Sequence, residues 1–255
     1  MIEFKNVSKH YKSNVALENV SVRINKGDFV FLVGPSGAGK STFIKLILKE
    51  INADSGSIKV RGTEVTTLSR RQVPQLRRNI GIVFQDFRLL PKKTVYENVA
   101  FAMEIVYQPK KLIKKYVPQV LSMVGIAEKA DKYPDELSAG EQQRVAIARA
   151  IVNKPRILIA DEPTGNLDPD TAWEIMQLLD QINMRGTTIL MVTHAKDIVD
   201  KMGKRVVAIE NGRIVRDEFG AYGFEEALAD IEMSTDTIQS KRTFRSKFRR
   251  GDRQE

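Results

Sequence analysis

A glycine-rich run has the residue types that hold the phosphate groups of a nucleotide. With the residue after it, the run is Gly34-Pro35-Ser36-Gly37-Ala38-Gly39-Lys40-Ser41-Thr42. It matches Gly-x-x-x-x-Gly-Lys-Ser/Thr between a predicted strand, Phe29 to Val33, and a predicted helix, Lys40 to Glu50. Backbone N–H groups would wrap a β-phosphate, Lys40 would reach the β and γ oxygens, and Ser41 would offer its hydroxyl to Mg²⁺. The run predicts an ATP site, and a glycine-rich turn is the alternative.

Two acids follow a second apolar run. Arg156 to Ala160 is a predicted strand, and Asp161 and Glu162 come directly after it. Ligands of open parallel sheets bind at the carboxyl ends of the strands, so we expect both acids beside the phosphate loop. Asp161 is assigned to Mg²⁺, directly or through water, and Glu162 to orienting and polarising the attacking water. A surface turn or a helix start is the alternative.

Composition bounds the class of protein. The chain has 255 residues, is 42% hydrophobic, and contains no cysteine and two histidines. This is enough for one large domain or two small ones. Disulfides and cysteine zinc sites are excluded, so any metal is expected to be bound by oxygen atoms. There is no long apolar run and no signal-peptide pattern, so we expect an intracellular chain that does not itself enter a membrane.

The net charge of +9 is unevenly distributed. Residues 241–255 hold seven basic groups against two acidic ones, and residues 221–240 hold five acidic groups and no Lys or Arg. We expect residues 221–255 to form a flexible tail, acidic and then basic, that only aids solubility. The alternative is a membrane-surface helix that contacts anionic lipid through Phe244, Phe248 and the cations around them. Binding of nucleic acid is suggested only by the pI of 9.6 and this tail.

The order of predicted elements indicates an α/β fold. Short β-type runs at Ile2 to Val7, Val20 to Ile24 and Ser57 to Val60 come early. A strand at Ile80 to Phe84 leads into a helical region at about 86–152. Helix and strand then alternate, with a helix at Thr171 to Met184 and a strand at Thr188 to Val192, which is typical of a parallel sheet. A hairpin through Asn211-Gly212 closes a domain predicted to span residues 1–220.

A further motif resembles the signature of the ABC transporter ATPase family, Leu-Ser-Gly-Gly-Gln. Here it is Leu137-Ser138-Ala139-Gly140-Glu141-Gln142, so Ala139 and Glu141 depart from the commonest form. Ser138 and Glu141 also have the spacing of a capping box before a helix at Gln142 to Val152, and both interpretations can hold. In the family an N-terminus of this kind, here with Ser138 and Gly140 expected to be exposed, holds the γ-phosphate on the opposite subunit's nucleotide.

The resemblance covers roughly residues 2 to 217 and implies roles for further residues. Tyr11 would stack on adenine, Gln85 would link the Mg²⁺ and water site to the helical subdomain, Asp168 would face the partner's site, and His194 would contact the γ-phosphate. The alternatives are a strand-edge tyrosine, a loop glutamine, an Asp-Pro turn and an incidental histidine. The implied magnesium ligands are Ser41, Gln85 and Asp161. The implied catalytic residues are Glu162, His194 and Gln85.

The resemblance also implies an assembly. The expected fold is an ABC-type P-loop NTPase with a RecA-like parallel core, an antiparallel β subdomain and a helical signature subdomain. One phosphate loop and one signature in the chain imply a head-to-tail homodimer, with two ATP molecules held between Lys40 and Ser138 of opposite chains. The absence of a coiled coil, a second cassette and a fused membrane span favours an ATPase that serves a separate membrane subunit.

The run at 83–99 resembles the cell-division branch of this family. That likeness implies a place on the cytoplasmic face of the membrane, an FtsX-like transmembrane partner and, indirectly, control of an extracellular peptidoglycan hydrolase. Lipoprotein-release and macrolide-export ATPases share the run at 163–168 and are the competing types. Phe87 to Met103 is the expected docking surface, with Phe87 and Leu89 in the interface and Val99, Phe101 and Met103 in the core. An ATP-gated binding scaffold is the alternative that does not depend on turnover.

Overall fold

The computed structural model describes residues 1–12 and 14–220. The predictions for the acidic stretch and the basic tail, including the lipid contact, lie outside the described residues. Among the described residues no helix has both the length and the apolar character needed to cross a membrane.

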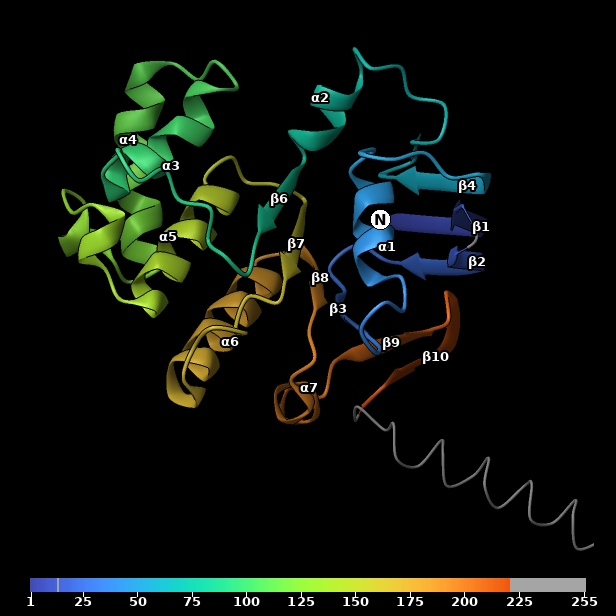
Figure 1. The fold of residues 1–255 in the computed structure, drawn as a ribbon. Helices are drawn as coiled ribbons and strands as arrows, with labels where there is room; N and C mark the ends of the chain where they lie inside the picture. Colours follow the sequence, from blue (N-terminus) through green and yellow to red (C-terminus); the bar gives the residue numbers. More distant parts are fainter. Residues whose placement is uncertain (13, 221–255) are drawn as a thin grey trace, which may run out of the picture. The chain divides into compact units, whose positions relative to one another are not determined.

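A six-stranded sheet forms the centre of the fold, in the order β10-β9-β3-β8-β7-β6 (Figure 1). Its strands are β3 (Phe29–Val33), β6 (Ile80–Val83), β7 (Ile157–Asp161), β8 (Thr188–Val192), β9 (Arg205–Glu210) and β10 (Arg213–Phe219). All are parallel except β10, which pairs antiparallel with β9. Every residue of β3 and β8 is buried, because elements cover both faces of the sheet. The predicted α/β class is therefore confirmed.

A second, antiparallel sheet has the order β2-β1-β4-β5. Its strands are β1 (Ile2–Tyr11), β2 (Asn14–Ile24), β4 (Ser55–Val60) and β5 (Thr63–Glu64). It packs on α1 (Lys40–Ile47), where the rings of Phe4 and Phe43 stack with centroids 4.1 Å apart. β1 and β2 are longer than predicted, because irregularities in their register interrupt the alternation of buried and exposed residues that the sequence pattern requires.

The remaining helices are α2 (Val73–Arg77), α3 (Val95–Glu104), α4 (Lys110–Met123), α5 (Ala139–Ile151), α6 (Pro169–Met184) and α7 (Lys196–Met202). Two 3₁₀ turns, η1 (Ala127–Lys129) and η2 (Pro134–Glu136), precede α5. Figure 1 shows α5 and α6 on one side of the parallel sheet and α1 with the antiparallel sheet on the other. The buried Val99 of α3 and Val145 of α5 belong to the core of the helical region.

The hairpin of β9 and β10 reaches back to the glycine-rich loop. Asn211 and Gly212 have φ values of 47° and 76°, as predicted for this turn. The Gly212 N–H donates to the Ala38 carbonyl at 3.1 Å, and its carbonyl accepts from the Glu18 N–H at 2.8 Å. The turn thus ties the loop to the antiparallel sheet.

Candidate nucleotide-binding site

The glycine-rich loop connects β3 to α1. Gly34 has φ 147° and Gly39 has φ 112°, which side chains rarely adopt. A Cβ at Gly34 would overlap the Ile209 carbonyl oxygen, and one at Gly39 would overlap the Ala16 carbonyl oxygen. Gly39 is the N-cap of α1 and provides no side-chain cap, so the first turn of the helix lacks a capping side chain. The loop presents the backbone donors that an anion requires.

Lys40 is folded into the loop, with only 6% of its surface exposed. Its Nζ donates to the carbonyls of Gly34 at 2.7 Å and Pro35 at 2.9 Å. Burial lowers the pKa of the Lys40 ammonium, although the carboxylates of Glu162 and Asp161 oppose that shift. A phosphate would therefore replace two neutral carbonyl acceptors with a charged one.

Asp161 and Glu162 lie at the carboxyl end of β7. Asp161 pairs in register with Val192 at the end of β8, and the Glu162 N–H donates to the Val192 carbonyl at 2.9 Å. Burial raises the pKa of Asp161, and the neighbouring Glu162 carboxylate raises it further. Glu162 has φ 49°, a left-handed conformation in which its backbone turns away from the strand direction.

His194 follows the end of β8 and faces Glu162. Its Nε2 lies 3.1 Å from Glu162 Oε1, and its side chain is 43% exposed. The segment is anchored by the buried Thr193, whose Oγ1 accepts from the Ala195 N–H at 3.0 Å. The pairing of β7 with β8 is what brings this acid and this histidine together.

A single pocket of 360 Å³ collects many of the predicted residues. They are Tyr11, Ser36, Gly37, Gly39, Lys40, Ser41, Thr42, Asp161, Glu162 and His194. Three predicted loop residues do not line it, because Gly34 and Ala38 are buried and Pro35 is exposed outside the pocket. The start of β2, Asn14 to Ala16, also lines it, and the sequence pattern carried no signal for those residues.

Three predicted groups lie outside this pocket. Gln85 is exposed after β6, where its Nε2 lies 3.4 Å from Asn166 Oδ1 and its carbonyl accepts from Asn166 Nδ2 at 3.2 Å. The signature residues begin α5, and Asp168 begins α6 with its Oδ1 accepting from the Thr171 N–H at 3.0 Å. The structure therefore joins Gln85 to the loop before α6 and leaves Ser138 and Asp168 away from the nucleotide pocket.

The predicted capping box is confirmed. Ser138 Oγ accepts from the Glu141 N–H at 3.3 Å, and Glu141 Oε2 accepts from the Ser138 N–H at 2.8 Å. The expectation that Gly140 is exposed is wrong. It is buried, and a Cβ there would overlap Thr171 Cγ2, because α5 and α6 approach closely at their N-termini. Ser138 and Ala139 are exposed.

Three polar side chains, not predicted from the sequence, bond the backbone of segments beside the site. The buried Gln143 of α5 donates from Nε2 to the Pro163 carbonyl at 2.6 Å, directly after Glu162. The buried Asn98 of α3 bonds both the N–H and the carbonyl of Leu90, and Arg149 of α5 donates to the carbonyls of Phe87 and Arg88. Side chains that bond distant backbone groups have no short sequence motif by which to find them.

The fold and the loop define a class of protein. Residues 17–165 match the family model described as ABC transporter, and the chain belongs to that family of ATPases. The chain is 38% identical to a bacterial ABC transporter cassette solved as a dimer, with a TM-score of 0.78 over 86% of this chain and 98% of the other. A dimeric cassette in a post-hydrolysis state bound to ADP and Pi matches with a TM-score of 0.77 and 37% identity over the same shares of the two chains.

Curated relatives give a narrower likeness. A protein of Bacillus subtilis named Cell division ATP-binding protein FtsE is 57% identical over 88% of this chain and 99% of its own length. A protein of the same name from Streptococcus pneumoniae is 55% identical, covering 89% of this chain and 99% of the relative. The chain is thus an ATP-binding and ATP-hydrolysing ABC subunit with close FtsE relatives.

Proposed function

We propose that this chain is the ATPase of a cell-division complex. On ATP binding, two copies close, and hydrolysis drives a conformational change in an FtsX-like transmembrane partner at the cytoplasmic face of the membrane, which regulates a peptidoglycan hydrolase outside. The names of the FtsE relatives support a role in cell division. The dimeric cassettes support the closure of two copies on ATP. The observation that carries the proposal is the pocket where the phosphate loop meets Asp161, Glu162 and His194.

The chemistry follows from the pocket's residues. Glu162 Oε1 accepts a proton from water as the water oxygen attacks the γ-phosphorus, and the bond to the bridging β,γ oxygen breaks to leave ADP and phosphate. His194 lies 3.1 Å from that carboxylate, so it can hold Glu162 in place and contact the γ-phosphate. Lys40 and the α1 N-terminus bind the β and γ oxygens.

The residues present fit Mg²⁺. The Ser41 hydroxyl and the Asp161 carboxylate line the same pocket, and Mg²⁺ prefers oxygen ligands of this kind together with water and substrate phosphates. Bound Mg²⁺ would neutralise charge on the phosphate oxygens. Gln85 does not line the pocket, so its proposed contact requires a movement of the loop that follows β6.

A dimer would complete the site. Ser138 and Asp168 lie outside the pocket of their own chain, and each presents an exposed, capped helix start. The test is light scattering of the Glu162→Gln protein with ATP, with Lys40→Ala combined with Glu162→Gln as the control that cannot hold the nucleotide. We expect the single variant to dimerise and the double variant to stay monomeric. A Glu162→Gln protein that stays monomeric at high concentration, alone and with its partner, contradicts the proposal.

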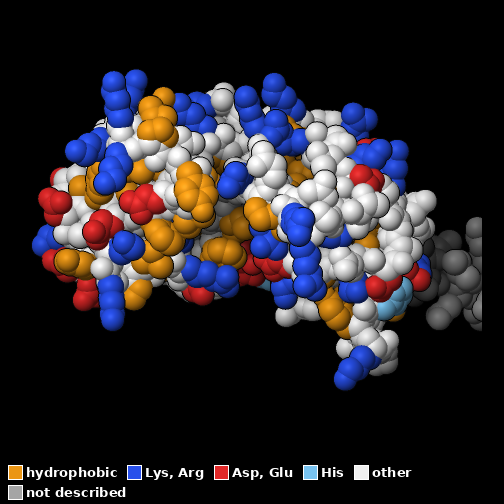
Figure 2. All heavy atoms as spheres, turned by 90° about the horizontal axis from the view of Figure 1, so that it is seen from above, with side chains coloured by type: hydrophobic (Ala, Val, Ile, Leu, Met, Phe, Trp, Pro, Cys, Tyr) orange, Lys and Arg blue, Asp and Glu red, His pale blue; other side chains and the backbone are white. Residues whose placement is uncertain are grey.

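The partner surface is proposed at the helical region. Val99 and Met103 are buried as predicted, whereas Phe101 is only half-buried. Phe87 and Leu89 are half-buried and suited to an interface. Ile105 and Tyr107 at the end of α3 are 56% and 87% exposed, and Figure 2 shows hydrophobic side chains gathered on the half that carries these helices. These two residues extend the surface that the sequence predicted.

Leu89→Asp tests this surface. We expect binding to the FtsX-like protein to be lost in co-purification while ATP affinity stays the same. Val215→Asp is the matched control, since Val215 is exposed on β10 of the parallel sheet and lies in no part of the proposed surface. Undiminished binding of the Leu89→Asp protein contradicts the assignment.

A further inference from the structure

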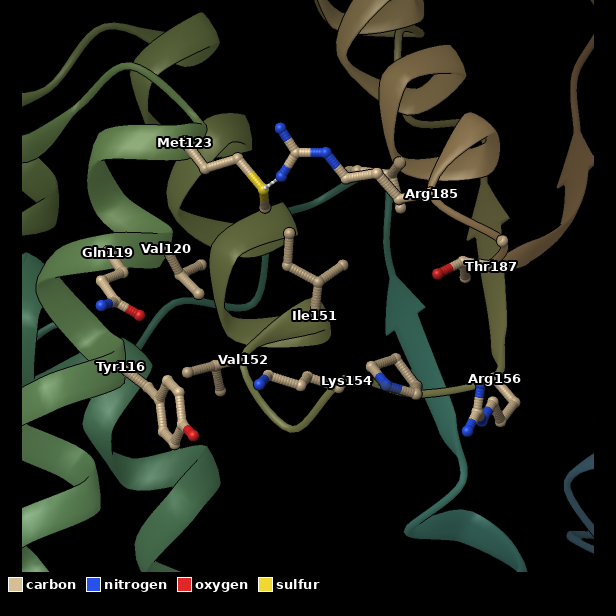
Figure 3. Close-up of a pocket in the computed structure, with 13 residues that line it drawn as sticks. Tyr116, Gln119, Val120, Met123, Ile151, Val152, Lys154, Arg156, Arg185 and Thr187 are labelled. Carbon is tan, nitrogen blue, oxygen red and sulfur yellow. Dashed lines mark hydrogen bonds between the residues drawn. The ribbon is translucent and has the colours of Figure 1, made fainter.

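A second cavity lies at the amino ends of the parallel strands, opposite the carboxyl ends that face the nucleotide pocket. It has a volume of 520 Å³ and lies where β7 and β8 begin, between α4, the end of α5 and the end of α6. Its floor is the buried side chains of Ile151, Val152 and Ile182, and Val120 and Met123 of α4 form one wall (Figure 3). A cavity of this size and lining suits an apolar group of a ligand or partner.

The rim of this cavity is basic. Lys154, Arg156 and Arg185 line it, and among residues 1–12 and 14–220 none of the three has a carboxylate within ion-pair distance. Lys154 lies over the Tyr116 ring, 4.3 Å from its centroid, and the Arg185 guanidinium contacts the Met123 sulfur. Arg144 of α5, by contrast, pairs with the Glu174 carboxylate at 2.6 Å.

The neighbouring helix α4 adds to the positive charge around this cavity. α4 carries four lysines, at 110, 111, 114 and 115, and has no acidic residue between 110 and 123. An apolar floor surrounded by cations without carboxylate partners attracts an anion that has apolar groups of its own. Its charges meet complementary charges while its apolar surface leaves water. The cavity is complementary to an acidic, amphipathic ligand.

The arrangement of the cations distinguishes between such ligands. In Figure 3, Arg185 and Lys154 lie on opposite sides of Ile151, with the apolar side chains between them. A lipid carries its charge at one end of its apolar chains and would meet one side only. A peptide helix can place carboxylates on both sides of an apolar residue, because positions three and four apart share a face.

We propose that this cavity is a docking site for an acidic amphipathic segment of a partner protein. An apolar side chain of the segment occupies the floor at Ile151, Val152 and Ile182, and its carboxylates pair with Lys154 and Arg156 on one side and Arg185 on the other. The site lies away from the phosphate loop, so it would let a soluble acidic partner bind while the nucleotide pocket and the apolar surface around Leu89 remain available.

The probe is a fluorescein-labelled helical peptide of 18 residues, with leucines on one face and glutamates beside them. Anisotropy with the full-length chain measures its affinity. A scrambled peptide of the same composition controls for net charge, and a version with lysine in place of glutamate controls for sign. We expect the patterned acidic peptide to bind at least tenfold more tightly than the scrambled one. Equal affinities would overturn the proposal.

Charge reversal locates the binding. The double variant Lys154→Glu with Arg185→Glu should lower the affinity for the acidic peptide more than tenfold. It should bind the lysine peptide instead. The matched control is Lys26→Glu with Arg70→Glu, which removes the same charge from exposed residues elsewhere and should leave the affinity unchanged. Equal losses of peptide affinity in the two double variants would mean that general charge attraction causes the binding, and would overturn the proposed site. Circular dichroism checks that both are folded.

Vesicles separate the lipid alternative. The same proteins are sedimented with vesicles of phosphatidylglycerol and phosphatidylcholine. If the rim reversal abolishes vesicle binding but leaves peptide affinity intact, the cavity is a lipid site and the peptide proposal is wrong. Loss of peptide affinity with vesicle binding unchanged supports it.

Discussion

The phosphate-loop half and the signature half of this chain are built to different degrees of completeness. In the first, residues from β3, α1, β7 and β8 line one pocket, Lys40 is buried, and Glu162 and His194 are already in contact. In the second, Ser138 and Asp168 are exposed and, among residues 1–12 and 14–220, their side chains bond the first turn of their own helices. One half forms a pocket within a single chain, whereas the other presents an exposed surface.

Under the proposed dimer, this difference would make ATP hydrolysis depend on a second copy of the chain. The residues expected to bind phosphate are held by β3, α1, β7 and β8 of one chain, so binding would need no partner. Those expected to act on the opposite nucleotide are satisfied locally, so they carry no buried unpaired group while they are alone. Gln143 joins the halves, because it lies on the signature helix and bonds the Pro163 carbonyl next to Glu162.

The largest effect is expected when the phosphate-loop half loses its lysine. Lys40→Met should lower ATP affinity by about 100-fold, since a charge-assisted hydrogen bond contributes roughly 1.5–3 kcal/mol and each 1.4 kcal/mol is tenfold. Equilibrium binding of a fluorescent ATP analogue measures it. Lys45→Met, on the same helix but exposed, is the control and should bind normally. Equal affinities of the two variants would show that the loop does not bind ATP through Lys40.

The incomplete half is tested by Ser138→Asp. Aspartate caps a helix as well as serine does, so the thermal unfolding midpoint should not fall. A carboxylate facing the partner's γ-phosphate should nevertheless lower the rate of ATP hydrolysis at least about fivefold, because like charges about 4 Å apart repel by roughly 1–4 kcal/mol. Ser138→Asn, which caps without charge, is the control. If the Asp and Asn variants hydrolyse ATP equally fast, Ser138 is a cap and nothing more.

Much of the difference between the two halves could be predicted from the sequence, because it depends on residues that are close together in the chain. Phe29 to Val33 is an unbroken apolar run followed by glycines, which predicts a buried strand and a loop, and both are observed. The contact of Gly140 with Thr171 and the bond from Gln143 to Pro163 join residues distant in the chain. Their partners are fixed only by the packing of α5 on α6 and β7, so no spacing rule reveals them.

A pH series sharpens the account of the complete half. Because burial and Glu162 raise the pKa of Asp161, a proton competes with Mg²⁺ at a higher pH than it would at an ordinary aspartate. Affinity for Mg²⁺–ADP should fall by up to about tenfold per pH unit as the pH drops through that raised pKa. Calorimetry of Asp161→Asn corrects for the nucleotide's own titration. An identical pH dependence in both proteins would remove Asp161 from the magnesium site.

The smallest effect concerns the packing behind the signature. Gly140→Ala should lower the free energy of unfolding by about 1–2 kcal/mol, because the new methyl group overlaps Thr171 Cγ2. Thr171→Ser removes that atom and should restore most of the loss when the two changes are combined. Urea unfolding of the four proteins of the cycle measures the coupling. Additive losses would mean that Gly140 is required for its backbone and not for its contact.

The hairpin turn at Asn211-Gly212 bears on how such chains can vary in evolution. It supplies the donor for the Ala38 carbonyl and the acceptor for the Glu18 N–H, while the Ile209 carbonyl lies against Gly34. A deletion here would withdraw support from a loop some 170 residues earlier in the sequence. We therefore expect the length of the turn between β9 and β10 to be kept among related chains.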